Sequence, residues 1–174
     1  MNIKYIFALA LCAISFDSIQ ASQSLTGKKA PIFSGQAVFP DGTIDIFNLK
    51  DYTGQNIVVY FYPMDNSPGC TLQAKKFRDE IKKLQNKNIM VVGISGDSVK
   101  SHQKFSDKLA LPFPLISDSI KKNSIAKKYK TTGFILGKRH TFLINKKGIV
   151  FKVFDHVDIK NQVDDIVTAF ATQK

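Results

Sequence analysis

Cysteine is scarce in this sequence, which holds only two in 174 residues, Cys12 and Cys70. Two cysteines can form at most one disulfide, which excludes the disulfide-stapled scaffolds common among small exported domains. Cys12 lies in an N-terminal apolar run that we expect to be removed. Cys70 would then be alone, and a lone cysteine is either an inert buried residue or a reactive thiol.

The sequence also lacks an apolar run of the roughly 20 residues that span a bilayer. Its N-terminal run, Ile6 to Ile14, follows the positive charge of Lys4 and leads to a small residue at Ala21. This order is typical of a secretory signal peptide covering residues 1–21. We therefore expect an exported, periplasmic protein without stable membrane insertion. The alternatives are a retained anchor and lipidation of Cys12, although a leucine precedes Cys12 where lipoproteins prefer a small residue.

Acidic residues are few, since 14 Asp and Glu face 25 Lys and Arg, for a net charge of +11. Removing residues 1–21 takes away one Lys and one Asp and leaves this balance unchanged. No nucleic-acid-binding motif accompanies the charge, so we expect no nucleic-acid partner. Lysines are densest between Lys121 and Lys130, at helical spacing, which indicates a solvated helix face. Attraction to an anionic envelope surface or an acidic partner is the alternative.

No internal repeat, low-complexity segment or domain linker interrupts residues 22–174. Their length of about 150 residues suits a single domain with a substantial core. The three histidines, His102, His140 and His156, show no metal-ligand spacing. We expect neither a metal nor another cofactor.

Cys70 ends a turn-rich stretch between a predicted strand and a predicted helix. Ile57 to Phe61 is an apolar run typical of a strand buried on both faces. Apolar residues then recur at helical spacing up to Leu84. Cys70 therefore lies near a helix N-terminus, where free N–H groups and the helix dipole favour an anion such as a thiolate.

The other elements follow from similar patterns. Hairpins are predicted at 33–47 and 139–154, because each pairs two apolar runs across a turn. A second buried strand is predicted at 89–94, a helix up to Leu109 with Asp97 or Ser98 as its N-cap, and a closing helix around 163–170. The proline-bounded segment 111–118 is predicted to be an edge or connecting strand.

This order of elements predicts an α/β fold of the thioredoxin-like kind, with a mixed central sheet flanked by helices and an N-terminal β-hairpin. A fold of this kind does not by itself specify a reaction.

Several segments resemble peroxiredoxins of the bacterioferritin-comigratory, or PrxQ, subfamily. The family motif, a proline followed after three residues by Thr or Ser and after two more by Cys, is matched by Pro63, Ser67 and Cys70. The segments 111–118 and 139–144 match the family at the expected places. The resemblance covers nearly all of the chain from Gly27 onwards.

The resemblance implies a thiol-dependent peroxidase that reduces hydrogen peroxide and organic hydroperoxides. Cys70 would attack the peroxide as a thiolate and become a sulfenic acid. Ser67 would hydrogen-bond the peroxide, and Pro63 would wall the pocket. Arg139 corresponds to the active-site arginine and would stabilise the thiolate and the transition state. Structural roles remain alternatives: a turn and helix cap for Ser67, and a surface strand position for Arg139.

Many relatives carry a resolving cysteine five residues after the first, a position that Lys75 occupies here. The helix up to Leu109 holds no cysteine either, so we expect a 1-Cys mechanism in which an external thiol, from a thioredoxin-like protein or a small molecule, resolves Cys70. We expect a monomer or a weak homodimer. Two other classes remain open: a thiol-disulfide oxidoreductase, disfavoured because no Cys-x-x-Cys pair is present, and a non-catalytic binding module of the same fold.

Overall fold

The computed structural model describes residues 22–119, 124–131 and 139–173. The expected signal peptide lies outside this range, as do Lys121 and Lys122 of the lysine-rich run. The described elements, in chain order, are β1 (Ser34–Val38), β2 (Ile44–Asn48), the 3-10 helix η1 (Leu49–Tyr52), β3 (Asn56–Phe61), α2 (Pro68–Asp79), α3 (Ile81–Gln85), β4 (Ile89–Ser95), α4 (Val99–Leu109), β5 (Leu115–Ser117), α5 (Ser124–Lys128), β6 (His140–Ile144), β7 (Val150–Phe154) and α6 (Gln162–Ala171).

The described strands form one seven-stranded sheet in the order β2-β1-β5-β4-β3-β6-β7. β3 runs parallel to β4, and β4 runs parallel to β5, whereas the other neighbours are antiparallel. A parallel pair needs a crossover, which α2 and α3 supply between β3 and β4. The predicted mixed sheet and both predicted hairpins are confirmed.

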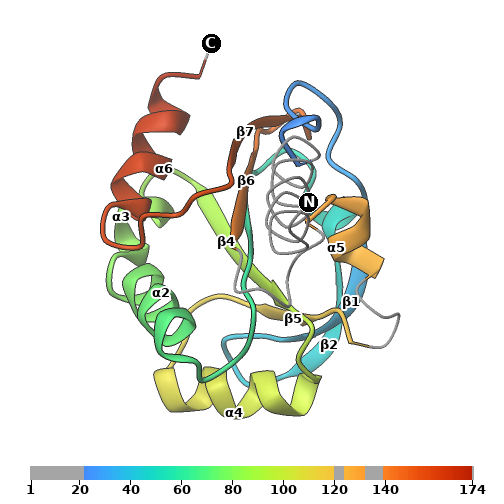
Figure 1. Ribbon diagram of the computed structural model, residues 1–174, viewed down its shortest axis with the longest axis vertical. Coiled ribbons are helices and arrows are strands. Elements are labelled where there is room, and N and C mark those ends of the chain that lie inside the picture. The colour runs from blue at the N-terminus through green and yellow to red at the C-terminus, as the bar shows by residue number, and fades with distance from the viewer. Residues whose placement is uncertain (1–21, 120–123, 132–138, 174) are drawn as a thin grey trace, which may run out of the picture.

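Side chains alternate between the two faces of the sheet and build a separate core on each. On β3, Val58 and Tyr60 join the cluster that contains α2, α3, α4 and α6, whereas Ile57, Val59 and Phe61 join the opposite cluster. Figure 1 shows α2, α3 and α6 on one side of the sheet and α5 on the other. Helices therefore flank both faces, as predicted.

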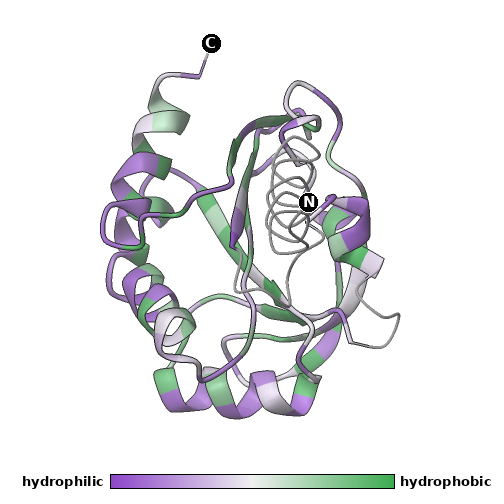
Figure 2. Cartoon of the chain, in the orientation of Figure 1, coloured by the Kyte–Doolittle hydropathy of each residue, from purple (hydrophilic) through white to green (hydrophobic). Residues whose placement is uncertain are grey.

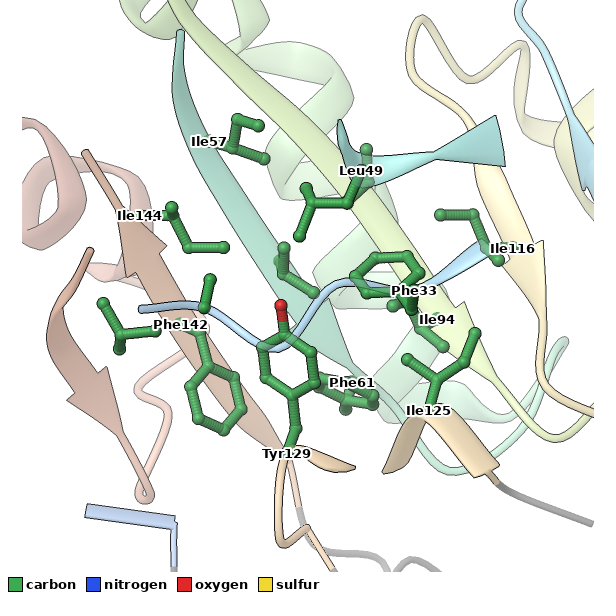
Figure 3. Packing of buried hydrophobic residues seen from close by; sticks show 14 of the residues in the cluster. Phe33, Leu49, Ile57, Phe61, Ile94, Ile116, Ile125, Tyr129, Phe142 and Ile144 are labelled. Atoms are coloured by element: carbon green, nitrogen blue, oxygen red, sulfur yellow. The ribbon is translucent and has the colours of Figure 1, made fainter. Parts of the chain in front are cut away.

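The helices that cover the sheet are amphipathic, as packing against the sheet on one side requires. Figure 2 shows hydrophilic and hydrophobic residues alternating around the described helices, so that each helix can bury one side. Figure 3 shows the core opposite α2, where Phe33, Phe61, Tyr129 and Phe142 pack from different elements. The ring of Tyr129 meets that of Phe142 edge-on, with 4.9 Å between the ring centroids. Burial raises the pKa of Tyr129, so its phenol is neutral.

Two predictions about individual elements need correction. The helix after Cys70 does not run unbroken to Leu84, because α2 ends at Asp79 and α3 begins at Ile81, with Glu80 capping both. The segment 111–118 does not form an edge strand, since β5 lies between β1 and β4 inside the sheet. Pro112 and Pro114 precede β5, so no proline lies within its ladder, and the proline restriction does not apply.

Other boundaries agree with the sequence patterns. Ser98 is the N-cap of α4, and its side chain accepts a hydrogen bond from the backbone N–H of Ser101. In the part of the chain that the structure describes, no helix combines the length and apolar character needed to cross a membrane.

Gly93 on β4 gives a direct test of this packing. A Cβ at this position would lie 2.7 Å from both Cζ and Oη of Tyr60 and 2.8 Å from Cδ2 of Leu115. We expect Gly93→Ala to lower the free energy of unfolding by about 1–3 kcal/mol, because over-packed cores must shift to relieve such contacts. Chemical denaturation measures this loss.

The double variant with Tyr60→Phe is the matched control. It removes Oη, one of the three clashing atoms, and should recover part of the loss. A Gly93→Ala variant as stable as the wild type would show that the packing around Tyr60 is looser than described.

Candidate active site

Cys70 lies in the first turn of α2 and is 2% exposed. Ser67 is the N-cap residue, with extended backbone angles, and Pro68 follows at the start of the helix, where its missing N–H costs nothing. The first turn of α2 holds no acidic residue. The unpaired N–H groups and the positive end of the helix dipole therefore favour a thiolate at Cys70.

Arg139 brings a fixed positive charge to this helix start from a distant part of the chain. β6 pairs antiparallel with β3 so that His140 lies opposite Phe61. Arg139, one residue before His140, therefore lies beside the end of β3, where the chain turns toward α2. Its Nη2 donates a hydrogen bond to Sγ of Cys70 at 3.3 Å. A guanidinium at this distance stabilises the thiolate over the thiol.

Gly69 makes this contact sterically possible, and the sequence analysis did not single it out. A Cβ at residue 69 would lie 2.6 Å from Nη2 of Arg139, closer than real Cβ contacts allow. A glycine within a helix normally destabilises it. A glycine immediately before the candidate reactive cysteine was the signal that could have indicated a close approach.

Ser67 and Pro63 lie in the loop between β3 and α2. The Oγ of Ser67 donates to the carbonyl oxygen of Met64 at 3.1 Å and does not cap the helix. Pro63 is half-buried directly after Tyr62. The structure thus joins Cys70 to Arg139 by a direct contact, while the roles of Ser67 and Pro63 toward a peroxide stay predictions.

Two buried tyrosines lie on the β3 side of Cys70. Burial raises the pKa of Tyr60 and that of Tyr62 well above the usual value, and the charge of Asp65 adds to both shifts. Both phenols are therefore neutral at physiological pH. They supply apolar packing around the thiol, with a stacked contact of 5.4 Å between ring centroids.

Two buried glutamine side chains link α2 to α6 and to β6. Nε2 of Gln73 donates to Oε1 of Gln162 on α6 at 3.0 Å, and Nε2 of Gln162 donates to Oγ1 of Thr141 at 3.1 Å. Gln73 lies one helical turn after Cys70, and Thr141 lies two residues after Arg139. These bonds join the elements that carry the cysteine and the arginine, and sequence spacing alone gave no sign of them.

Arg78 and Lys75 lie on other parts of α2. Arg78 forms an ion pair with Asp79 at 2.7 Å and donates to the carbonyl of Leu109 at 3.0 Å, which supports a structural role. Lys75, five residues after Cys70, is exposed. The residues that the structure describes contain no group of His, Cys, Asp and Glu side chains able to hold a metal ion.

Known proteins are similar to this chain over most of its length. The model of the AhpC/TSA family matches residues 26–153. The chain is 38% identical over 152 residues to a putative peroxiredoxin bcp of Coxiella burnetii, covering 81% of this chain and 95% of that protein. It is 41% identical over 112 residues to the chloroplastic peroxiredoxin Q of Sedum lineare, covering 63% of this chain and 59% of that protein.

A solved structure of peroxiredoxin Q from Xanthomonas campestris superposes with a TM-score of 0.70 at 26% identity, covering 81% of this chain and 90% of that one. The fold, the matched family model and the sequence relatives therefore agree with the resemblance noted in the sequence. The chain belongs to the AhpC/TSA family, among the peroxiredoxins of the bacterioferritin-comigratory and PrxQ subfamily.

Proposed function

We propose that this protein is a thiol-dependent peroxidase that works by a 1-Cys mechanism. The observation that carries the proposal is the hydrogen bond from Nη2 of Arg139 to Sγ of Cys70 at the N-terminus of α2. Helix dipole and guanidinium both favour the thiolate, which is the nucleophilic form of cysteine. Family membership supplies the class of substrate, hydrogen peroxide and organic hydroperoxides.

In the first step the Cys70 thiolate attacks one oxygen of the peroxide. An S–O bond forms as the O–O bond breaks, the sulfur loses two electrons, and the departing oxygen leaves as water or an alcohol after taking up a proton. The donors of the Arg139 guanidinium stabilise the negative charge that moves onto the oxygens in the transition state. The product on the enzyme is a Cys70 sulfenic acid.

The second half of the cycle requires thiols from another molecule. Cys12 lies in the segment that we propose to be the signal peptide, so a processed chain has no second cysteine to form an intramolecular disulfide. An external thiol condenses with the sulfenic acid to a mixed disulfide and releases water. A second thiol then restores the Cys70 thiol and leaves as the disulfide of the reductant.

The cellular compartment that we propose for this cycle is inferred from the sequence of residues 1–21. Their signal-peptide pattern supports export to the periplasm, where the reductant would be a thioredoxin-like protein or a small thiol. A monomer or weak homodimer remains our expectation for the oligomeric state.

Treatment with stoichiometric peroxide tests the proposed chemistry directly. We expect Cys70 to become a sulfenic acid, detectable by intact mass with a sulfenate trap, and an added thiol to return it to the reduced form. Cys70→Ser should abolish thiol-dependent peroxide consumption, since no other residue supplies the nucleophile. An untouched Cys70 thiol at peroxide doses that oxidise other peroxiredoxins would refute the peroxidase.

Gly69→Ala tests whether the Arg139 contact drives the reaction. The new Cβ displaces Nη2 of Arg139, so we expect the rate constant for peroxide to fall at least about tenfold, and Arg139→Ala to cost about 10²–10³-fold. Alanine suits a helix better than glycine, so the free energy of unfolding should stay the same or rise by up to about 1 kcal/mol.

Lys75→Ala, on the exposed side of the same helix, is the control and should leave the peroxide rate unchanged. Equal rates for Gly69→Ala and the wild type would mean that the contact between Arg139 and Cys70 does not limit catalysis.

A further inference from the structure

The loop from Pro63 to Ser67 carries two of the predicted site residues yet lies outside both β3 and α2. Regular ladders do not fix such a segment, so other bonds must hold its shape. Within the loop, Asp65 is 5% exposed, and a buried carboxylate is costly unless several donors reach it. Its partners therefore indicate what holds the loop.

The Asp65 carboxylate has three side-chain partners. Oδ1 accepts from the Tyr62 hydroxyl at 2.8 Å, and Oδ2 accepts from Oγ of Ser101 at 2.7 Å. Nδ1 of His102 lies 2.9 Å from Oδ2. The backbone N–H of Asp65 donates to Oδ2 of Asp97 at 2.9 Å. One loop residue is thus bonded to the end of β3, to α4 and to the turn before α4.

His102 lies at the centre of this cluster and is fully buried. Its Nε2 faces the carbonyl oxygen of Ile116 on β5 at 3.2 Å, while its Nδ1 faces the Asp65 carboxylate. The Tyr62 hydroxyl, which donates its proton to Asp65, also lies 3.3 Å from Nδ1, so both ring nitrogens face acceptors. A neutral ring would point a lone pair at one of them, whereas a doubly protonated ring donates to both.

The other charged and titratable groups around this pair are accounted for. Oδ2 of Asp97 is held by the Ser95 hydroxyl at 2.6 Å as well as by the backbone of Asp65. The Tyr62 phenol is kept neutral, because burial raises its pKa. Lys108 of α4 reaches the loop and donates to Oδ1 of Asn66 at 3.1 Å. Among the basic groups near this cluster, His102 is thus the one that faces the Asp65 carboxylate directly.

The loop also has an unusual backbone conformation. Asn66 has a φ of +59°, in the left-handed region that asparagine enters more readily than other non-glycine residues. Its neighbour Ser67 is the N-cap of the helix that bears Cys70. A change in the backbone at Asn66 would therefore shift Ser67 and, with it, the first turn of α2.

We propose that Asp65 and His102 are positioning residues for the peroxidase reaction. Their buried ion pair, joined by Tyr62 and Ser101, holds the loop in the conformation that places Ser67 and Cys70. The inference rests on the proposed peroxidase function, because its effect is expressed in the reactivity of Cys70 toward peroxide. Neither residue touches the sulfur, so the pair acts through the loop.

The test compares His102→Phe with Asp65→Asn. His102→Phe leaves the carboxylate without its cation, so we expect the peroxide rate constant to fall at least tenfold. We expect Cys70 also to react faster with a bulky thiol reagent such as an aromatic disulfide, because the first turn of α2 opens. Asp65→Asn keeps the shape and can donate to a neutral imidazole, so it should retain a larger share of the peroxide rate.

Nitrogen-15 NMR of the imidazole ring measures how many protons His102 carries, which a loss of stability alone does not change. In the wild type we expect both ring nitrogens of His102 to carry a proton, and in Asp65→Asn only one. Asp118→Asn is the matched control. Asp118 is another buried carboxylate, 3% exposed, which accepts from the backbone N–H groups of Ile125 and Ala126 and touches no part of the loop.

Asp118→Asn should lower stability but keep the peroxide rate of the wild type. The inference is overturned if His102→Phe reacts with peroxide like the wild type, if Asp118→Asn loses as much rate at an equal loss of stability, or if His102 carries one ring proton. Should His102→Phe not fold, Asp65→Asn and Ser101→Ala supply the same comparison. A wild-type protein inert to peroxide would refute the peroxidase, while the NMR and thiol-labelling results would still decide whether the pair holds the loop.

Discussion

The candidate active site depends on one long-range contact, the hydrogen bond from the Arg139 guanidinium to the Cys70 sulfur across 69 residues of sequence. The pairing of β3 with β6 makes this contact possible, because their antiparallel register places Arg139 beside the end of β3. A helix start completes it, because α2 presents Cys70 in its first turn with unpaired N–H groups nearby. Gly69 leaves the space into which Nη2 fits.

Two different hydrogen-bond networks support the contact between Arg139 and Cys70. On the side of α6, the amides of Gln73 and Gln162 connect the cysteine helix to β6 through Thr141. On the side of α4, the pair of Asp65 and His102 binds the loop that leads into the helix. Both are buried polar networks, which lose more when one partner is missing than they gain when complete. Small changes in either network should therefore alter the position of the Cys70 sulfur relative to Arg139.

Much of the fold could be predicted from sequence, because the buried runs of β3 and β4 and the two hairpins have strong local patterns. The predictions that were wrong concern features that tertiary contacts determine. β5 has three residues, too few to show whether the strand is central, and the break at Glu80 does not interrupt the apolar spacing on which the helix was predicted. Cys70 could be identified from its place at a predicted helix start, and Arg139 from the family resemblance. Gly69, Asp65 and His102 were missed because their significance lies in contacts between elements, which single-sequence patterns do not contain.

Arg139 and the start of α2 together favour the thiolate form of Cys70. Thiolate absorbance near 240 nm at neutral pH, measured against the Cys70→Ser chain as a blank, tests it most directly. The account predicts a clear thiolate signal in the wild type and a much smaller one in Arg139→Ala, with both chains folded. Equal signals in the two proteins would contradict it, because the guanidinium would then contribute nothing to the charge state of the sulfur.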